Sequence, residues 1–195
     1  MTTNLDLSPS SRRLFLGNTT KWALSAGAIA LLGGKDVLAQ AMGGPVSADV
    51  NILNVALGLE YEGINAYQLG LTSGLLQPQV AAVATKFQDD HKGHRDALIA
   101  TITKMDGKPV AEKSLDEYAK ALKADTLKSQ TDVLDLAVRL ELGATNAYLG
   151  VIPSFKDAQL AKIAGRLAAD EAMHYAVLLG ALGRPLPNSA LPFGA

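Results

Sequence analysis

The segment EYEGINAY (residues 60–67) decides the fold, because a related segment, ELGATNAY (residues 141–148), recurs later in the chain. Each copy is followed, at nearly the same separation, by a second pattern: HKGH (residues 91–94) after the first copy and EAMH (residues 171–174) after the second. Duplication of a pair of helices is the economical explanation of two repeats in the same order. The repeats therefore predict a bundle with pseudo-twofold symmetry.

From residue 49 onward the apolar positions follow the helical period, and no segment alternates every second residue as a half-buried strand does. Gly74, the segment DGKP (residues 106–109) and Pro153 mark the turns. We expect an all-α domain, a four-helix bundle made of two repeated helical hairpins joined by a long crossover. The expected helices cover residues 49–73, 78–105, 130–151 and 157–182, with a short helix at 114–122. The bundle then spans residues 49–182 and is followed by an irregular tail, residues 183–195.

The apolar stripe of the first expected helix contains one acidic residue. Positions 53, 57, 64, 67 and 71 are apolar and step by three or four, and the missing step is Glu60. Glu60 is therefore expected to face the core. The other three helices also carry a carboxylate or an imidazole at this level of their inward faces. The inward set is Glu60, His91, His94, Glu141, Glu171 and His174.

Three carboxylates close together in a core require a positive charge between them, because the interior solvates an ion poorly. Lys and Arg side chains fall off the inward stripes, so metal is the simplest counter-charge. A structural polar layer without metal is the alternative. Tyr67 and Tyr148 suit either a plain core position or a contact with the metal ligands.

Composition excludes several other functions. The net charge of −1 gives no basic field for a nucleic acid partner. The chain has no cysteine, which excludes disulfides, iron–sulfur clusters, thiolate zinc sites and cysteine nucleophiles. Any metal must therefore bind oxygen and nitrogen atoms.

The first 41 residues have the features of a twin-arginine signal peptide. SRRLFLG (residues 11–17) precedes an apolar run, residues 22–32, that is too short to span a bilayer of roughly 30 Å. Ala39 and Ala41 form a small-x-small cleavage site, and we expect cleavage after Ala41, with Ala39 as the second choice. The alternative is a tail that ends in an uncleaved anchor helix. The prediction is export to the periplasm or medium, with no stable membrane anchor after cleavage.

The chain resembles the ferritin-like superfamily, and within it the exported bacterial ferritin-like domain proteins related to desiccation-associated proteins. The resemblance rests on Glu followed seven residues later by Tyr on the first and third helices, and on Glu-x-x-His on the fourth. It implies that Glu60 and Glu141 are terminal ligands and that Glu171 bridges two metals. It also implies that His94 and His174 each bind one metal.

The second helix departs from this pattern, because His91 stands where the second bridging glutamate is expected. His91 would bind one ion alone, or the neighbouring Asp90 would supply the carboxylate instead. The site could then hold one metal, two unlike metals, or be degenerate.

The resemblance implies two iron ions, or manganese, and chemistry with oxygen or peroxide of the ferroxidase, peroxidase or catalase type. We place Glu171, Tyr67 and Tyr148 in the catalytic set. The alternative is a non-enzymatic stress-protective or scaffold bundle with a degenerate or structural metal site. Assembly into a homo-oligomer is left open.

Overall fold

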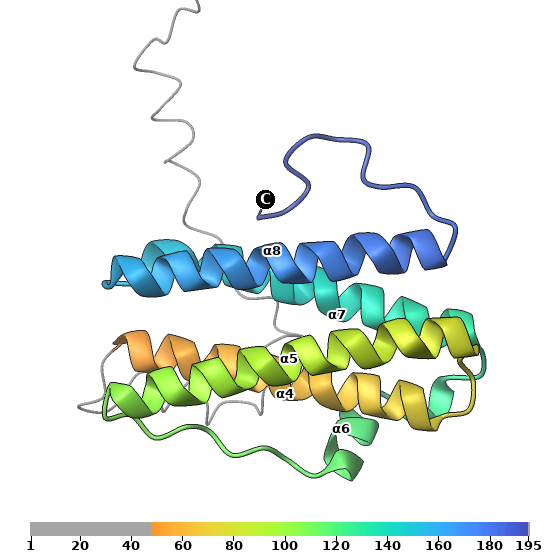
Figure 1. The fold of residues 1–195 in the computed structure, drawn as a ribbon, viewed down its shortest axis with the longest axis horizontal. Helices are drawn as coiled ribbons and strands as arrows, with labels where there is room; N and C mark the ends of the chain where they lie inside the picture. The colour runs from red at the N-terminus through yellow and green to blue at the C-terminus, as the bar shows by residue number, and fades with distance from the viewer. Residues whose placement is uncertain (1–47, 195) are drawn as a thin grey trace, which may run out of the picture.

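Four long helices form the bundle in the computed structural model, which describes residues 48–194 (Figure 1). They are α4 (Ala48–Thr72), α5 (Pro78–Lys104), α7 (Gln130–Val151) and α8 (Ala158–Ala181). The short helix α6 (Leu115–Ala121) and the 3-10 turns η1 (Ala124–Thr126) and η2 (Ile152–Ser154) complete the element list for these residues, which contain no strand. The all-helical expectation is confirmed, and every expected helix boundary lies within one residue of the observed one. The predicted signal peptide and its cleavage site lie outside the described residues.

Helix boundaries follow local chemistry. Pro78 opens α5, where its missing N–H has no intrahelical partner to lose. A capping box begins α6, since Ser114 accepts from the backbone of Glu117 while the Glu117 carboxylate accepts from the backbone of Ser114. Ser129 and Asp157 accept backbone N–H groups at the starts of α7 and α8. These residues fix where α5, α6, α7 and α8 begin.

The two hairpins pack against each other mainly through their first helices. α4 lies along α5, α7 lies along α8, and α4 also packs on α7 (Figure 1). The crossover between the hairpins runs beside α4 and is fixed there by Asn54, whose Oδ1 accepts from Val110 N at 2.7 Å. The Asn65 amide donates to Oε1 of Glu112 at 2.7 Å and fixes a second point of the same crossover.

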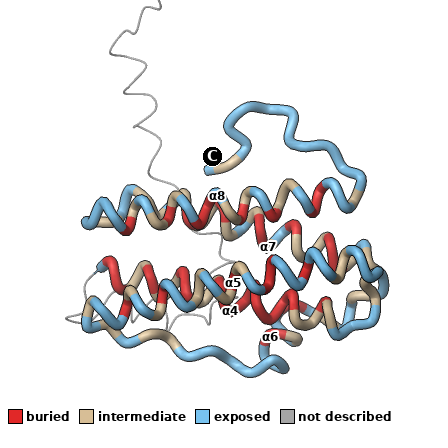
Figure 2. Tube along the Cα trace, viewed as in Figure 1, coloured by how far each residue is buried: buried red, intermediate tan, exposed pale blue. Residues whose placement is uncertain are grey.

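The buried residues lie mainly on the inner faces of the four long helices (Figure 2). They form two apolar clusters, one including Leu57, Ile102 and Leu160 and the other including Phe87 and Leu178. Along α5 and α8, the buried residues His91, Glu171 and His174 fall between the members of these clusters. The core is therefore interrupted at mid-bundle by a polar layer.

No helix in residues 48–194 is both long enough and apolar enough to cross a membrane.

The tail after α8 turns back over the bundle (Figure 1). Gly183, with φ of +66°, supports the left-handed turn that ends the helix. The Phe193 ring meets the Tyr175 ring edge to face at 5.6 Å. Gly194 N donates to Oδ1 of Asn146 at 2.8 Å, which attaches the end of the tail to α7.

Candidate metal centre

Six side chains from all four long helices meet in the polar layer. Because residues three apart share a helix face, α5 and α8 each present two of them together. The three carboxylates are fully enclosed, with exposures of 1% for Glu60, 1% for Glu141 and 0% for Glu171. The six residues are Glu60 on α4, His91 and His94 on α5, Glu141 on α7, and Glu171 and His174 on α8.

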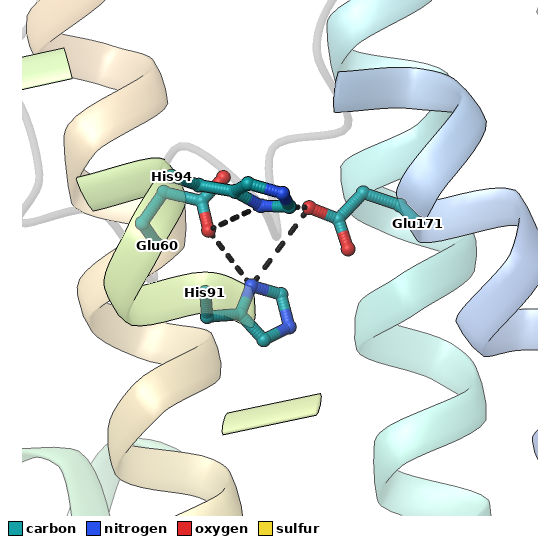
Figure 3. Close-up of side chains that lie close together, drawn as sticks. All are labelled: Glu60, His91, His94 and Glu171. Carbon is teal, nitrogen blue, oxygen red and sulfur yellow. Dashed lines mark hydrogen bonds and ion pairs between the residues drawn. The ribbon is translucent and has the colours of Figure 1, made fainter. Parts of the chain in front are cut away.

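One group of ligand atoms comes from Glu60, His91, His94 and Glu171, which point toward one another from α4, α5 and α8 (Figure 3). Nδ1 of His91 lies 2.7 Å from Oε2 of Glu60, and Nδ1 of His94 lies 3.2 Å from Oε1 of Glu171. All four ligand atoms lie within 4.8 Å of one another. Two nitrogens and two oxygens at this spread suit a divalent ion with bonds of ~2.0–2.2 Å.

A second group comes from His91, Glu141, Glu171 and His174, also within 4.8 Å of one another. Nδ1 of His174 lies 3.1 Å from Oε2 of Glu171 and 3.5 Å from Oε1 of Glu141. Nε2 of His91 lies 3.3 Å from the same Glu141 oxygen. Both groups share His91 and Glu171.

The two shared residues present different atoms to the two groups. Oε1 of Glu171 faces His94, while its Oε2 faces His174. Nδ1 of His91 faces Glu60, while its Nε2 faces Glu141. The His91 ring therefore lies between the two groups, at the place where a second bridging carboxylate is expected.

Three buried polar atoms in this layer have no hydrogen-bond partner: Nδ1 of His94, Oε2 of Glu141 and Oε1 of Glu171. An unpaired buried polar atom is costly in a protein core. Two of the three, on His94 and Glu171, belong to the first group and face each other at 3.2 Å. The donor set and these unpaired atoms fit divalent metal ions.

Two tyrosines hold the outer carboxylates crosswise. The Tyr67 hydroxyl on α4 donates to Oε1 of Glu141 on α7, and the Tyr148 hydroxyl on α7 donates to Oε1 of Glu60 on α4. Burial and the adjacent Glu141 charge raise the pKa of Tyr67 well above its ordinary value, and burial with Glu60 does the same to the pKa of Tyr148. Both hydroxyls therefore stay protonated and keep donating.

Two aspartates contact the outer nitrogens of the histidines, again crosswise. Nε2 of His94 on α5 lies 3.2 Å from Oδ2 of Asp170 on α8, and Nε2 of His174 on α8 lies 3.4 Å from Oδ2 of Asp90 on α5. A carboxylate on the outer nitrogen orients the ring and directs its Nδ1 at the centre. Asp90, which also pairs with Lys86, lies outside both ligand groups.

Sequence reasoning did not select Asp170. The repeat could have identified it, because Asp170 comes directly before Glu171 just as Asp90 comes directly before the matching residue His91.

The buried charges shift the pKa values of the layer in opposite directions. Burial favours the neutral ring, but Glu171 and Glu60 outweigh it and raise the pKa of His94 to about 10. The carboxylates of Glu141 and Glu171 likewise overcome burial and raise the pKa of His174 to about 9. For Glu60, burial acts to raise the pKa, but the hydrogen bond with His91 and the nearby His94 ring lower it to about 2. A metal ion must therefore displace protons from these histidines before it can bind their nitrogens.

Gly63 is a further residue that the sequence did not single out. A Cβ at this position would lie 3.0 Å from Cε1 of His91 and 3.1 Å from both of its ring nitrogens. The His91 ring thus packs directly on the α4 backbone, in the space that a side chain at position 63 would occupy. In the second repeat the matching residue is Ala144, and the residue matching His91 is Glu171.

A ferritin-like domain family model matches residues 48–184. The crystal structure of a conserved hypothetical protein from Mycobacterium tuberculosis matches with a TM-score of 0.58 and 24% sequence identity, covering 74% of this chain and 96% of that one. At this identity the likeness concerns the fold alone. The curated proteins contain no match to this sequence. Because the family model spans well over half of the chain, this protein belongs to the ferritin-like domain family.

Proposed function

We propose that this chain is an exported metal-binding protein that holds two ions, iron or manganese, and reacts with oxygen or peroxide. One observation carries the proposal: two buried groups of nitrogen and oxygen ligand atoms share His91 and Glu171. Such donor sets suit iron and manganese rather than metals that prefer sulfur.

Each residue of the layer has a distinct task in this proposal. Glu60 and His94 would hold one ion, Glu141 and His174 would hold the other, and His91 and Glu171, which belong to both groups, would contribute to both. The ions, when bound, supply Lewis acidity and electrons for the reduction of oxygen or peroxide. Tyr67 and Tyr148 act as positioning residues, since their hydroxyls fix the orientation of the outer carboxylates.

Access to the layer is available beside α5 and α8. A cavity of about 220 Å³ borders His94 and Asp170 and also touches Arg166. The His94 side chain is 12% exposed, against 4% for His91, so His94 is the more accessible of the two. A small polar oxidant can approach the first ligand group from this side.

The test combines metal analysis with activity. We expect close to two iron or manganese ions per mature chain, Fe(II) oxidation or peroxide consumption, and loss of both metal and activity in the variant Glu171→Ala with His174→Ala. Asp116→Ala, which removes an exposed carboxylate on α6, is the control and should match the parent. Equal activity in the parent and the double variant would overturn the redox assignment.

A second candidate is a non-enzymatic stress-protective or scaffold bundle. It is favoured by His91, whose ring lies within reach of both Glu60 and Glu141. Burial opposes its protonation, but these two carboxylates raise the pKa of His91 well above its ordinary value, so the layer can balance charge without metal. A folded mature protein with no bound metal after purification from a native-like host would select this candidate.

Export rests on the N-terminal sequence. We expect the mature chain to begin after Ala41 and to be found in the periplasm or medium. Cell fractionation with N-terminal sequencing tests this, with Arg12→Lys and Arg13→Lys together as the export-deficient variant. Retention of the parent in the cytoplasm with an intact N-terminus would refute it.

A further inference from the structure

We propose that a second cavity, separate from the one beside His94, binds a small neutral apolar molecule. The cavity has a volume of about 220 Å³ and is lined by residues from all four long helices and by Leu76 of the α4–α5 turn. Leu134 and Leu178 form part of its wall and are themselves buried. Such a space between the helices differs from a flat apolar patch, because side chains from four helices would contact a ligand there.

The lining determines the chemistry of the ligand. None of the lining residues is charged, and only Tyr67 and Gln79 have polar side chains. The Tyr67 hydroxyl already donates to Glu141, and Gln79 lies on the exposed side of α5. A polar ligand would lose its hydrogen bonds with water on entry and find no replacement, whereas a hydrocarbon has no such hydrogen bonds to lose.

The volume sets the size of the ligand. An apolar cavity of about 150 Å³ is large enough to bind benzene or xenon. The present cavity, at about 220 Å³, therefore has room for one substituted aromatic ring or a short branched alkane.

The cavity is reachable from solvent between α5 and α8. Val83 on α5 is 36% exposed and Val177 on α8 is 48% exposed, and both belong to the lining. These are among the large apolar residues that the bundle leaves exposed. Entry therefore requires no unfolding of a helix.

The cavity is next to the metal layer but not part of it. Tyr67 lies on its wall, and the Tyr67 ring is 5.6 Å from the ring of His91. Tyr67 therefore contacts both the cavity and the metal layer. Binding requires no metal, so the inference does not depend on the proposed redox function.

Toluene is a suitable probe, and benzoate is the control ligand because it places a carboxylate on the same ring. We expect the purified protein to bind toluene saturably in calorimetric titration, with or without metal, and to show no saturable binding of benzoate. Ala84→Leu and Ala137→Leu fill the cavity from α5 and α7 and should weaken toluene binding at least tenfold. Ala82→Leu, on the exposed side of α5, adds the same group outside the cavity and should leave the affinity unchanged.

Methyl NMR of the parent protein gives an independent measurement in case the filled variants do not fold. Toluene should shift the methyl signals of Val133 and Val177, which line the cavity, and leave those of Val50, in the other apolar cluster, in place. Absence of saturable toluene binding by the parent would overturn the inference. Unchanged affinity in both folded filled variants, or equal shifts at Val50, would do the same.

Discussion

Replacing Gly63 with alanine tests whether the His91 ring is held against α4. In an ordinary helix interior this change stabilises the fold by about 0.5–1 kcal/mol, because glycine has more backbone freedom to lose. Here the new Cβ would lie 3.0 Å from Cε1 of His91. The ring has little freedom to retreat, since its nitrogens lie 2.7 Å from Glu60 and 3.3 Å from Glu141.

The expected sign follows from the two opposing terms. Overpacking of a core costs ~1–3 kcal/mol. Taking about 2 kcal/mol for the clash and about 1 kcal/mol for the helix-propensity gain, Gly63→Ala should lower the free energy of unfolding by about 1 kcal/mol. The assay is urea denaturation of the metal-free protein, followed by metal titration, in which displacement of His91 should weaken binding.

Gly143→Ala is the matched control. Gly143 lies within α7, and a Cβ there would meet nothing within 4 Å. We expect this variant to gain about 0.5–1 kcal/mol in the free energy of unfolding and to bind metal as the parent does. If Gly63→Ala raises the free energy of unfolding as much as Gly143→Ala does, the His91 ring does not pack closely on α4.

Three further changes test other contacts of the layer. Tyr148→Phe removes the hydrogen bond to Glu60 and should lower the free energy of unfolding by ~1.5–3 kcal/mol in urea denaturation; an unchanged transition midpoint would contradict the contact. Asp170→Asn weakens the support of His94 and should reduce metal affinity by roughly 10–100-fold in chelator competition, and an affinity equal to that of the parent would deny Asp170 this role. His91→Glu adds a fourth carboxylate, which balances the charge of two divalent ions, and should raise metal affinity in chelator competition; a lower affinity would show that the imidazole is the better ligand.

Much of the fold was predictable because the signals were local. The apolar stripes, the prolines and the turn residues gave the helices and their limits to within one residue. Glu60 was identified as inward because it replaces an apolar residue at a fixed step of a stripe, and it is 1% exposed. The repeat then located its counterpart Glu141 on α7 at the same depth.

Features that depend on packing between helices were not predictable. Glu62 lies off the apolar stripe of α4, so the helical period does not predict its burial, but it is only 8% exposed and burial raises its pKa to about 7. The sequence offers Asp90 as an alternative metal ligand. In the structure Asp90 contacts Nε2 of His174, and this contact depends on how α5 and α8 approach each other. The role of Gly63 depends on the rotamer of His91, which periodicity does not specify.

The crossed contacts in the polar layer bear on the origin of the chain. Tyr67 on α4 supports Glu141 on α7, and Tyr148 on α7 supports Glu60 on α4. A single ancestral hairpin would have lacked these partners, so it could complete such a layer only by pairing with an identical copy. In that homodimer every mutation would have appeared on both sides at once. In a single chain the two halves are free to differ, as His91 and Glu171 do at matching positions.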